Sequence, residues 1–228
     1  MKNLERLEYL LGTENINKLK QAKVAVVGLG GVGSVATLAL ARSGIGTLVI
    51  QDFDVIQESN INRQLIANYT SIGHRKVDVM EEEILKVNPE CHVIKLFERF
   101  SKESKLFEND FQYLIDAIDS IEDKFLLIKE SIKNKISFIS AMGAAKKTDP
   151  KQLSVTRIDK TSYDPLAKII RRKLREENIK ENFMVVSSTE APAEIVRLGS
   201  YMPVTATAGL LLADYIIKLI IAGGKSCI

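Results

Sequence analysis

The sequence is poor in cysteine, and its cysteines are not spaced as metal ligands. Of 228 residues only Cys91 and Cys227 are cysteines, and they lie far apart in the chain. Structural zinc sites commonly use C-x-x-C pairs, so no cysteine-based zinc site is expected. Two cysteines in a chain of this length also predict reduced, cytosolic thiols rather than a framework of disulfides.

The N-terminal region lacks the apolar core of a signal peptide, because residues 1–20 alternate charged and apolar side chains. The one long apolar stretch, residues 204–222, is interrupted by Asp214 and Lys218, which lie four residues apart on one helix face. A membrane span is the alternative, since some stretches near this length cross bilayers. We expect instead a core or dimer-interface helix, no stable membrane insertion, and a cytoplasmic protein.

The chain does contain enough apolar residues for a full hydrophobic core. Hydrophobic residues make up 46% of the sequence and charged residues 27%, both ordinary for a globular protein. The net charge of +3 is mildly basic and does not by itself indicate nucleic-acid binding. One α/β domain is therefore the expected organisation.

The most informative stretch is residues 24–34, where an apolar β-branched run breaks into Gly28, Gly30, Gly31 and Gly33. This is a G-x-G-x-x-G pattern between an expected strand and an expected helix. Gly28 permits the tight turn, Gly30 lets a phosphate approach the backbone, and Gly33 lets the helix pack closely on the strand. The start of the helix offers unpaired N–H groups to an anion. The pattern predicts a bound nucleotide, and a glycine-rich turn without a ligand is the alternative.

Strands and helices alternate along residues 23–145. Strands are expected at residues 23–27, 47–52, 92–97, 111–117 and 136–141, and helices at 33–43, 73–87 and 121–133. This order predicts a Rossmann-like, mostly parallel sheet flanked by helices, with ligands at the carboxyl ends of the strands. The glycines, Asp52, Asp119 and Gly143 follow strands one, two, four and five, so we expect them to meet in one crevice. The long, polar connection at residues 57–71 indicates a functional loop.

After residue 145 the character of the chain changes. A basic helix carries Lys168, Arg171, Arg172, Lys173 and Arg175, and residues 183–188 form a further expected strand. The C-terminal extension is thus expected to contribute the basic helix and a dimer-interface helix. The basic helix is either a phosphate-binding face or a solvated face partly neutralised by Glu176 and Glu177.

Asp52 ends the second expected strand, about 20 residues after Gly33, where an acidic residue accepts hydrogen bonds from a ribose. This spacing is compatible with NAD, FAD or ATP, so a nicotinamide dehydrogenase stays open at this point. Arg63 and Lys76 favour ATP, because a site that splits a triphosphate needs cations where charge develops. Asp119 would hold magnesium, which takes one or two carboxylates together with phosphate oxygens. Each of these residues alone is more often a solvated surface side chain, but their combination around a glycine-rich loop favours the functional role.

Several of these motifs together resemble the ubiquitin-activating-enzyme-like (ThiF/MoeB) superfamily, whose members adenylate carboxylates. They are the glycine loop, the Asp-x-Asp at residues 52–54, Asn62-Arg63-Gln64, Lys76, and the Asp-Ala-Ile-Asp-Ser at residues 116–120. Within the superfamily, the sequence is most similar to the tRNA threonylcarbamoyladenosine dehydratases. The segments Asp164-Pro-Leu-Ala167 and Ser188-Thr-Glu190 favour this branch.

The resemblance implies roles for individual residues. Gly28, Gly30, Gly31 and Gly33 would hold ATP, and Asp52 would bind its ribose. Asn60, Arg63 and Lys76 would contact the phosphates and Asp119 would bind Mg²⁺, so Arg63, Lys76 and Asp119 are the expected catalytic residues. The remaining nucleotide-binding residues are expected to be Asp54, Asn62, Gln64, Asp116 and Ser120. Arg6 matches an arginine that reaches into the partner subunit's site, which implies a homodimer.

The implied reaction is the ATP-dependent cyclisation of threonylcarbamoyladenosine in tRNA. The substrate carboxylate attacks the α-phosphorus of ATP, and pyrophosphate leaves. The acyl-adenylate is then attacked from within the same side chain, which gives a five-membered ring and AMP. No protein nucleophile is needed, in agreement with the lack of a Ser/His/Asp or Cys/His constellation in the sequence.

The resemblance also implies the organisation and partners of the protein. It implies one ATP-binding adenylating domain over residues 1–228, with N-terminal helices at 1–22, a nucleotide-binding core at 23–145, and a substrate and dimerisation part at 146–228. The implied partners are tRNA, a second copy of the chain, and proteins of a sulfur relay or associated with cysteine desulfurases.

Two other functions stay open at this point. One is an adenylyltransferase that activates the C-terminal glycine of a ubiquitin-like sulfur-carrier protein, and the other is a non-catalytic nucleotide-binding module. Sulfur-carrier enzymes often carry two C-x-x-C pairs, and thioester-forming relatives need a cysteine in the second half of the chain, where this sequence has only Cys227. Both features count against a protein substrate.

Overall fold

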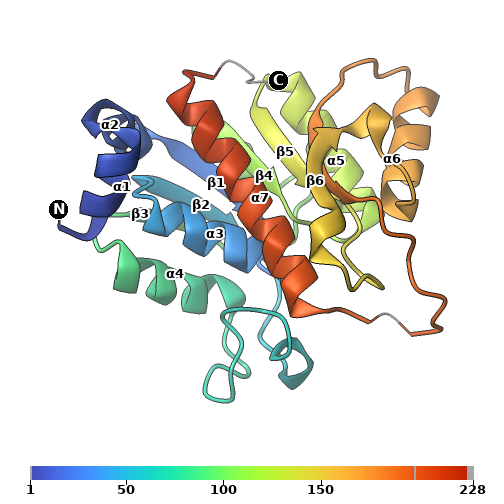
Figure 1. The fold of residues 1–228 in the computed structure, drawn as a ribbon, viewed down its shortest axis with the longest axis horizontal. Helices are drawn as coiled ribbons and strands as arrows, with labels where there is room; N and C mark the ends of the chain where they lie inside the picture. The colour runs from blue at the N-terminus through green and yellow to red at the C-terminus, as the bar shows by residue number, and fades with distance from the viewer. Residues whose placement is uncertain (1, 198, 225–228) are drawn as a thin grey trace.

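A mostly parallel sheet forms the centre of the structure, a computed structural model that describes residues 2–197 and 199–224 (Figure 1). Its seven strands lie in the order β3-β2-β1-β4-β5-β7-β6, and β6 is antiparallel to β7 while the other pairs are parallel. The strands are β1 (Lys23–Val27), β2 (Thr47–Gln51), β3 (His92–Leu96), β4 (Tyr113–Asp116), β5 (Ser137–Ala141), β6 (Leu153–Arg157) and β7 (Met184–Ser188). The expected Rossmann-like α/β fold is confirmed. Cys227 lies outside the described residues.

Helices cover both faces of this sheet (Figure 1). The α-helices are α1 (Glu5–Leu11), α2 (Thr13–Gln21), α3 (Gly33–Arg42), α4 (Lys76–Val87), α5 (Ile121–Lys133), α6 (Pro165–Glu176) and α7 (Met202–Ile221). The 3₁₀ helices are η1 (Lys2–Leu4), η2 (Glu58–Asn60), η3 (Lys105–Glu108), η4 (Pro150–Gln152) and η5 (Ile158–Lys160). One buried hydrophobic cluster joins α2, α3, α4 and α7 to the sheet, and a second joins α5 and α6 to its other face.

The turn after strand β1 has room only for glycine at two positions. Val24 to Val27 are all buried, as expected for a parallel strand covered on both faces. Gly28 has φ +90°, and a Cβ there would lie 2.7 Å from the Ala117 carbonyl oxygen. At Gly33 a Cβ would lie 1.7 Å from the Gly28 carbonyl oxygen. Larger residues therefore fit at neither position, and α3 packs directly against the end of β1.

The structure corrects two expected boundaries and adds one strand that was not expected. The helix expected from residue 73 begins at Lys76, because Gly73 has φ +85° and Arg75 pairs with Val55 in an isolated bridge. The strand expected at residues 111–117 is limited to β4, which ends as Asp116 enters the turn. The edge strand β6 was not expected at all, and its short alternation of half-buried and exposed residues gives only a weak signal.

The apolar helix α7 lies across the sheet and packs closely on α3 (Figure 1). It is the one helix among the described residues that is long and apolar enough to cross a membrane, and 50% of its most apolar window is buried inside the structure. The buried residues include Val204, Ala208, Leu212 and Ile216, which recur at helical spacing. The expectation of a core helix is therefore confirmed for this face of α7.

Candidate active site

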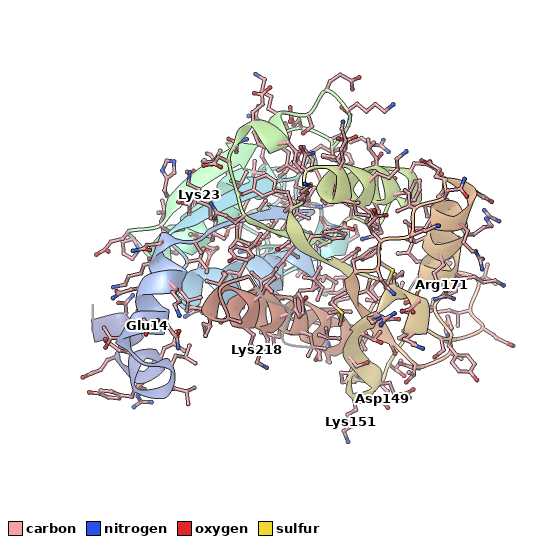
Figure 2. The ribbon with its side chains drawn as sticks, turned by 90° about the horizontal axis from the view of Figure 1, so that it is seen from above. Glu14, Lys23, Asp149, Lys151, Arg171 and Lys218 are labelled. Atoms are coloured by element: carbon pink, nitrogen blue, oxygen red, sulfur yellow. The ribbon has the colours of Figure 1, made fainter. Side chains whose placement is uncertain are left out.

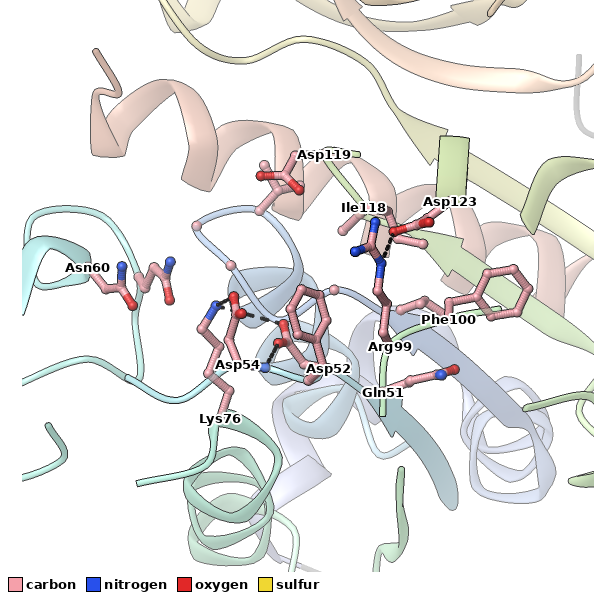
Figure 3. A pocket seen from close by; sticks show the side chains of 18 of the residues that line it. Gln51, Asp52, Asp54, Asn60, Lys76, Arg99, Phe100, Ile118, Asp119 and Asp123 are labelled. Atoms are coloured by element: carbon pink, nitrogen blue, oxygen red, sulfur yellow. Dashed lines mark hydrogen bonds and ion pairs between the residues drawn. The ribbon is translucent and has the colours of Figure 1, made fainter. Parts of the chain in front are cut away.

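A cavity of about 330 Å³ lies where the carboxyl ends of β1, β2, β3 and β4 meet (Figure 3). The strand order reverses between β1 and β4, and this is the position at which open α/β sheets bind ligands. Of the residues expected at the site, those that line the cavity are Gly28, Gly30, Gly31, Asp52, Asp54, Asn60, Arg63, Gln64, Lys76 and Asp119. The crevice expected from the sequence is thus present, with most of its expected residues.

The glycine loop supplies a backbone surface at one wall of the cavity. Gly30, Gly31 and Val32 line it directly, and α3 begins immediately afterwards at Gly33. Gly33 itself does not line the cavity, because it is packed against Gly28. The unpaired N–H groups of a helix start attract anions, so this wall suits a phosphate group.

Asp52, Asp54 and Lys76 form a network of ion pairs beside this loop (Figure 3). The Lys76 Nζ atom lies 2.7 Å from Asp54 Oδ2 and 3.9 Å from Asp52 Oδ2. Asp52 also accepts hydrogen bonds from the N–H groups of Leu29 at 2.6 Å and Asp54 at 2.8 Å. Burial raises the pKa of Asp52 above its ordinary value, and the attraction of Lys76 only partly offsets this effect.

The loop after β2 presents polar side chains to the same cavity. Asn60 is buried and its Oδ1 accepts from the N–H of Gln57 at 3.1 Å, which closes the turn of η2. The Arg63 guanidinium is half-buried and donates to Ser59 O and Asn62 Oδ1, both at 2.9 Å. Asn62 does not line the cavity, so its contact with the nucleotide site passes through Arg63.

The two aspartates that follow β4 lie in different surroundings. Asp119 is exposed, lines the cavity, and makes no hydrogen bond or ion pair with the described residues. Asp116 is fully buried outside the cavity lining, and its Oδ2 lies 2.8 Å from Lys124 Nζ. It also accepts from Ser140 Oγ at 2.6 Å and from the N–H of Ile118 at 3.0 Å. Asp116 therefore fixes the turn that presents Asp119.

The remaining expected nucleotide-binding residues lie away from the cavity. Ser120 is the N-cap residue of α5, and Arg6 is exposed on α1; neither lines the cavity within this chain. Gly143 was expected in the crevice but does not line it either, since β5 is one strand further from β1 than β4. Its N–H donates instead to Asp164 Oδ2 at 3.0 Å.

Asp164 forms another buried ion pair, near the end of β5. Lys147 Nζ lies 3.6 Å from Asp164 Oδ2, and both side chains are buried. Asp164 also caps α6, because its Oδ1 accepts from the N–H of Ala167 at 3.1 Å. The start of the basic helix is thereby held at the same edge of the sheet as the cavity.

The basic side chains of α6, among them Arg171 (Figure 2), differ in the partners that they have within the chain. Arg171 Nη1 donates to the carbonyl oxygens of Thr161 at 3.0 Å and Ile158 at 3.3 Å, so this residue anchors the preceding loop. Lys173 pairs with Glu122 at 2.8 Å. Lys168 and Arg175 are exposed and make no ion pair with the described residues.

Sequence reasoning missed one side of the cavity. Glu98, Arg99 and Phe100 line it, and they follow β3, the one strand before β6 whose carboxyl end was assigned no role. The rule that placed Asp52 and Asp119 at a common edge would also have found them. Further lining residues that were not expected are Gln51, Phe53, Val55, Ile118, Asp123 and Thr205, whereas Gln57 belongs to the connection that was expected to be functional. Nothing in the local sequence indicates that Thr205, at the start of α7, reaches the glycine loop.

The fold and this cavity define an α/β nucleotide-binding protein with cationic side chains beside a glycine loop. The chain belongs to the ThiF family, whose sequence model matches residues 3–226.

The chain is similar to proteins that are named tRNA threonylcarbamoyladenosine dehydratase. It is 44% identical over 192 residues to that of Bacillus subtilis, which covers 83% of this chain and 76% of the relative. With that of Escherichia coli it shares 38% identity over 183 residues, which covers 79% of this chain and 66% of the relative. The resemblance predicted from the sequence is thus confirmed.

The fold of this chain is also similar to that of a solved structure from this group of enzymes. The E. coli tRNA N6-threonylcarbamoyladenosine dehydratase TcdA, in complex with ATP, matches with a TM-score of 0.93 at 34% sequence identity. The match covers 97% of this chain and 95% of that one.

Proposed function

We propose that this protein catalyses the ATP-dependent cyclisation of threonylcarbamoyladenosine in tRNA, a dehydration that proceeds through adenylation of the substrate carboxylate. The observation that carries the proposal is that Arg63, Lys76 and Asp119 line one cavity beside the glycine loop. The relatives named above support the choice of substrate, and the ATP and AMP complexes of TcdA support the choice of nucleotide.

Different residues of the cavity bind ATP and stabilise charge in the first step, the adenylation of the substrate carboxylate. The glycine loop and the start of α3 bind phosphate oxygens, and Asp52 accepts from the ribose. An oxygen of the substrate carboxylate attacks the α-phosphorus, the bond to the bridging oxygen breaks, and pyrophosphate leaves. Arg63 and Lys76 stabilise the negative charge that develops on the phosphates.

The second step uses no group of the protein as a nucleophile. An atom of the carbamoyl group in the same side chain attacks the activated carbonyl carbon, the bond between that carbon and AMP breaks, and the carbamoyl group loses a proton as the five-membered ring closes. The protein acts by positioning both reacting groups and by stabilising charge. This agrees with the lining of the cavity, which contains no serine, cysteine or histidine among the residues that the structure describes.

The cavity also fits a magnesium ion bound together with ATP. Within the described part of the chain, Asp119 is an exposed carboxylate without a partner, and the buried Gln64 Oε1 has no hydrogen-bond donor. The described residues contain no group of three or more His, Cys, Asp or Glu side chains that would bind a metal unaided. Mg²⁺ commonly takes one or two carboxylates and phosphate oxygens, so Asp119 would hold the ion, which would neutralise phosphate charge.

The tRNA is proposed to contact the exposed cations of α6, whose start is held at the edge of the sheet that contains the cavity. Lys168 and Arg175 are free to pair with phosphates, whereas Arg171 is not. A homodimer is proposed because Arg6 is exposed outside the cavity, so it would reach a nucleotide site only in a second copy. Partners from a sulfur relay and a cytoplasmic location are proposed from the family resemblance alone.

Mass spectrometry of tRNA nucleosides tests this function. Cells that lack the protein are expected to lose cyclic threonylcarbamoyladenosine and to accumulate the linear form. Re-expression of the protein should restore the cyclic form, while the Lys76→Met variant should not. Unchanged nucleosides in the deleted strain, with no second gene for this activity, would contradict the proposal.

A further inference from the structure

The cavity has a second half that the phosphate-binding residues do not explain. Figure 3 shows Asn60 and Lys76 on one side of Asp52, and Arg99, Phe100 and Ile118 on the other. A ribose held at Asp52 with its phosphates toward Lys76 would therefore direct its base toward the second group. This half is completed by Phe53, Glu98 and Asp123.

The second half offers flat surfaces to a planar ring. Arg99 Nε donates to Asp123 Oδ2 at 2.7 Å, and its guanidinium carbon lies 5.7 Å from the centre of the Phe53 ring. Aromatic rings and guanidinium planes both stack on heteroaromatic bases. Stacking tolerates every base, so it does not determine which nucleotide binds.

Gln51, the last residue of β2, supplies a directional group in this half. Its side chain is buried, with only 1% of the residue exposed, and it lines the cavity. Its Nε2 donates to Ser104 Oγ at 2.9 Å and to the Glu98 carbonyl oxygen at 3.4 Å. Its Oε1 has no hydrogen-bond partner among the described residues, and it is closed to solvent in the ligand-free chain, so a ligand contacts it only when the amide or a neighbouring side chain shifts.

The hydrogen bonds around Gln51 fix which way its amide faces. The Glu98 carbonyl oxygen can only accept, so the group that faces it must be the amide NH₂. The Ser104 hydroxyl donates to Glu98 Oε1 at 2.8 Å, so it too must accept from Gln51. Rotating the amide would place acceptors against acceptors. The group left without a partner is therefore an acceptor, and a buried acceptor without a donor is costly.

We propose that Gln51 Oε1 accepts a hydrogen bond from the exocyclic amine of adenine and thereby contributes to the selection of ATP. Adenine has one hydrogen-bond donor group on its base edge, this amine, because its N1, N3 and N7 atoms only accept. A purine that lacks the amine leaves Gln51 Oε1 unpartnered. The inference rests on the proposed function, which assigns a nucleoside triphosphate to the cavity.

Paired binding measurements test this assignment. Isothermal titration calorimetry would give the dissociation constants of ATP and of purine riboside 5′-triphosphate, which lacks only the amine, each with Mg²⁺. Wild-type protein is expected to bind ATP about tenfold more tightly, as for one neutral hydrogen bond. In Gln51→Leu the two constants should become equal. Gln112→Leu, an exposed glutamine beside the amino end of β1, should keep the tenfold preference.

Each other outcome overturns a specific part of the account. Wild-type protein that binds ATP and its analogue equally would contradict the role of Gln51 while leaving the proposed function intact. A tenfold preference that survives in Gln51→Leu would mean that another group contacts the amine. Binding of neither nucleotide would contradict the proposed function itself. If Gln51→Leu does not fold, Gln51→Met removes the same acceptor and is expected to behave in the same way.

Discussion

Lys76 Nζ lies 2.7 Å from Asp54 Oδ2, so the lysine expected to contact phosphates is neutralised by a carboxylate of the same cavity. Lys76 is buried, whereas the Asp54 side chain is 47% exposed. The Asp54 carboxylate neutralises the buried ammonium group of Lys76 when no nucleotide is present. The negative charge of a triphosphate that enters the cavity would replace part of this neutralisation.

Replacing Lys76 is expected to remove adenylation. Lys76→Met should lower the rate of ATP–pyrophosphate exchange by about 10²–10³-fold, because a cation is lost where charge develops in the transition state. Exchange of labelled pyrophosphate into ATP in the presence of substrate tRNA measures this step. Lys95→Met is the matched control, since Lys95 pairs with Asp78 and Glu81 on the surface, and it should keep the wild-type rate. If Lys76→Met exchanged pyrophosphate at the same wild-type rate as Lys95→Met, Lys76 would have no role in adenylation.

The raised pKa of Asp52 predicts a pH effect on stability in the absence of nucleotide. A carboxyl group whose pKa is higher in the folded than in the unfolded state binds more protons when folded. Its contribution to the free energy of unfolding therefore increases as the pH falls through the folded-state pKa. As the pH falls from 7 toward about 4, the ordinary range of an aspartate, wild-type protein should gain stability relative to Asp52→Asn, which cannot titrate. Urea unfolding of both proteins measures the difference, and a difference that is constant or reversed in sign would contradict this prediction.

The buried pair of Asp116 and Lys124 is expected to hold the turn that carries Asp119. Lys124→Met leaves Asp116 buried without its cation and should lower the free energy of unfolding by about 3–5 kcal/mol. Lys133→Met, on the exposed end of the same helix, should change it little. Chemical denaturation measures both values. A small effect in Lys124→Met would show that the pair is not needed to hold the turn.

The basic helix predicts a division of roles between its cations. Changing Lys168 and Arg175 to alanine together should weaken tRNA binding and reduce the slope of log affinity against log salt by about 1–2, because two phosphate contacts are lost. Arg171→Ala should instead destabilise the loop before α6 with little change in the salt slope. Filter-binding measurements of tRNA affinity at several salt concentrations distinguish the double variant from Arg171→Ala. If the double variant kept the wild-type slope of log affinity against log salt, α6 would not contact tRNA phosphates, and its cations would only be solvated.

Much of the fold could be predicted from the sequence because its signals are local. The β-branched run before Gly28 and the alternation of strands and helices indicate a parallel sheet, and the rule on carboxyl ends then places Asp52 and Asp119 together. The role of Asp116 could not be predicted, since its neighbours Lys124 and Ser140 lie on other elements. The same applies to Thr205, which reaches the cavity only because α7 packs on α3.

The orientation of Arg171 was also beyond sequence reasoning. In the sequence it is one of five cations on an amphipathic helix, equivalent to its neighbours. In the structure it faces the carbonyl oxygens of Ile158 and Thr161, in a loop that precedes the helix. Periodicity predicts which face of a helix is polar, but a contact of this kind depends on how the preceding loop folds back.

The products formed from a substrate tRNA test the central claim most directly. Purified protein would be incubated with Mg²⁺, ATP and tRNA that carries linear threonylcarbamoyladenosine, and the nucleosides and nucleotides would be quantified. The account predicts one AMP and one pyrophosphate for each cyclic nucleoside formed, and formation of all three about 10²–10³-fold more slowly with Lys76→Met. Cyclisation without AMP release, or a protein that binds a nicotinamide or flavin coenzyme and ignores ATP, would contradict it.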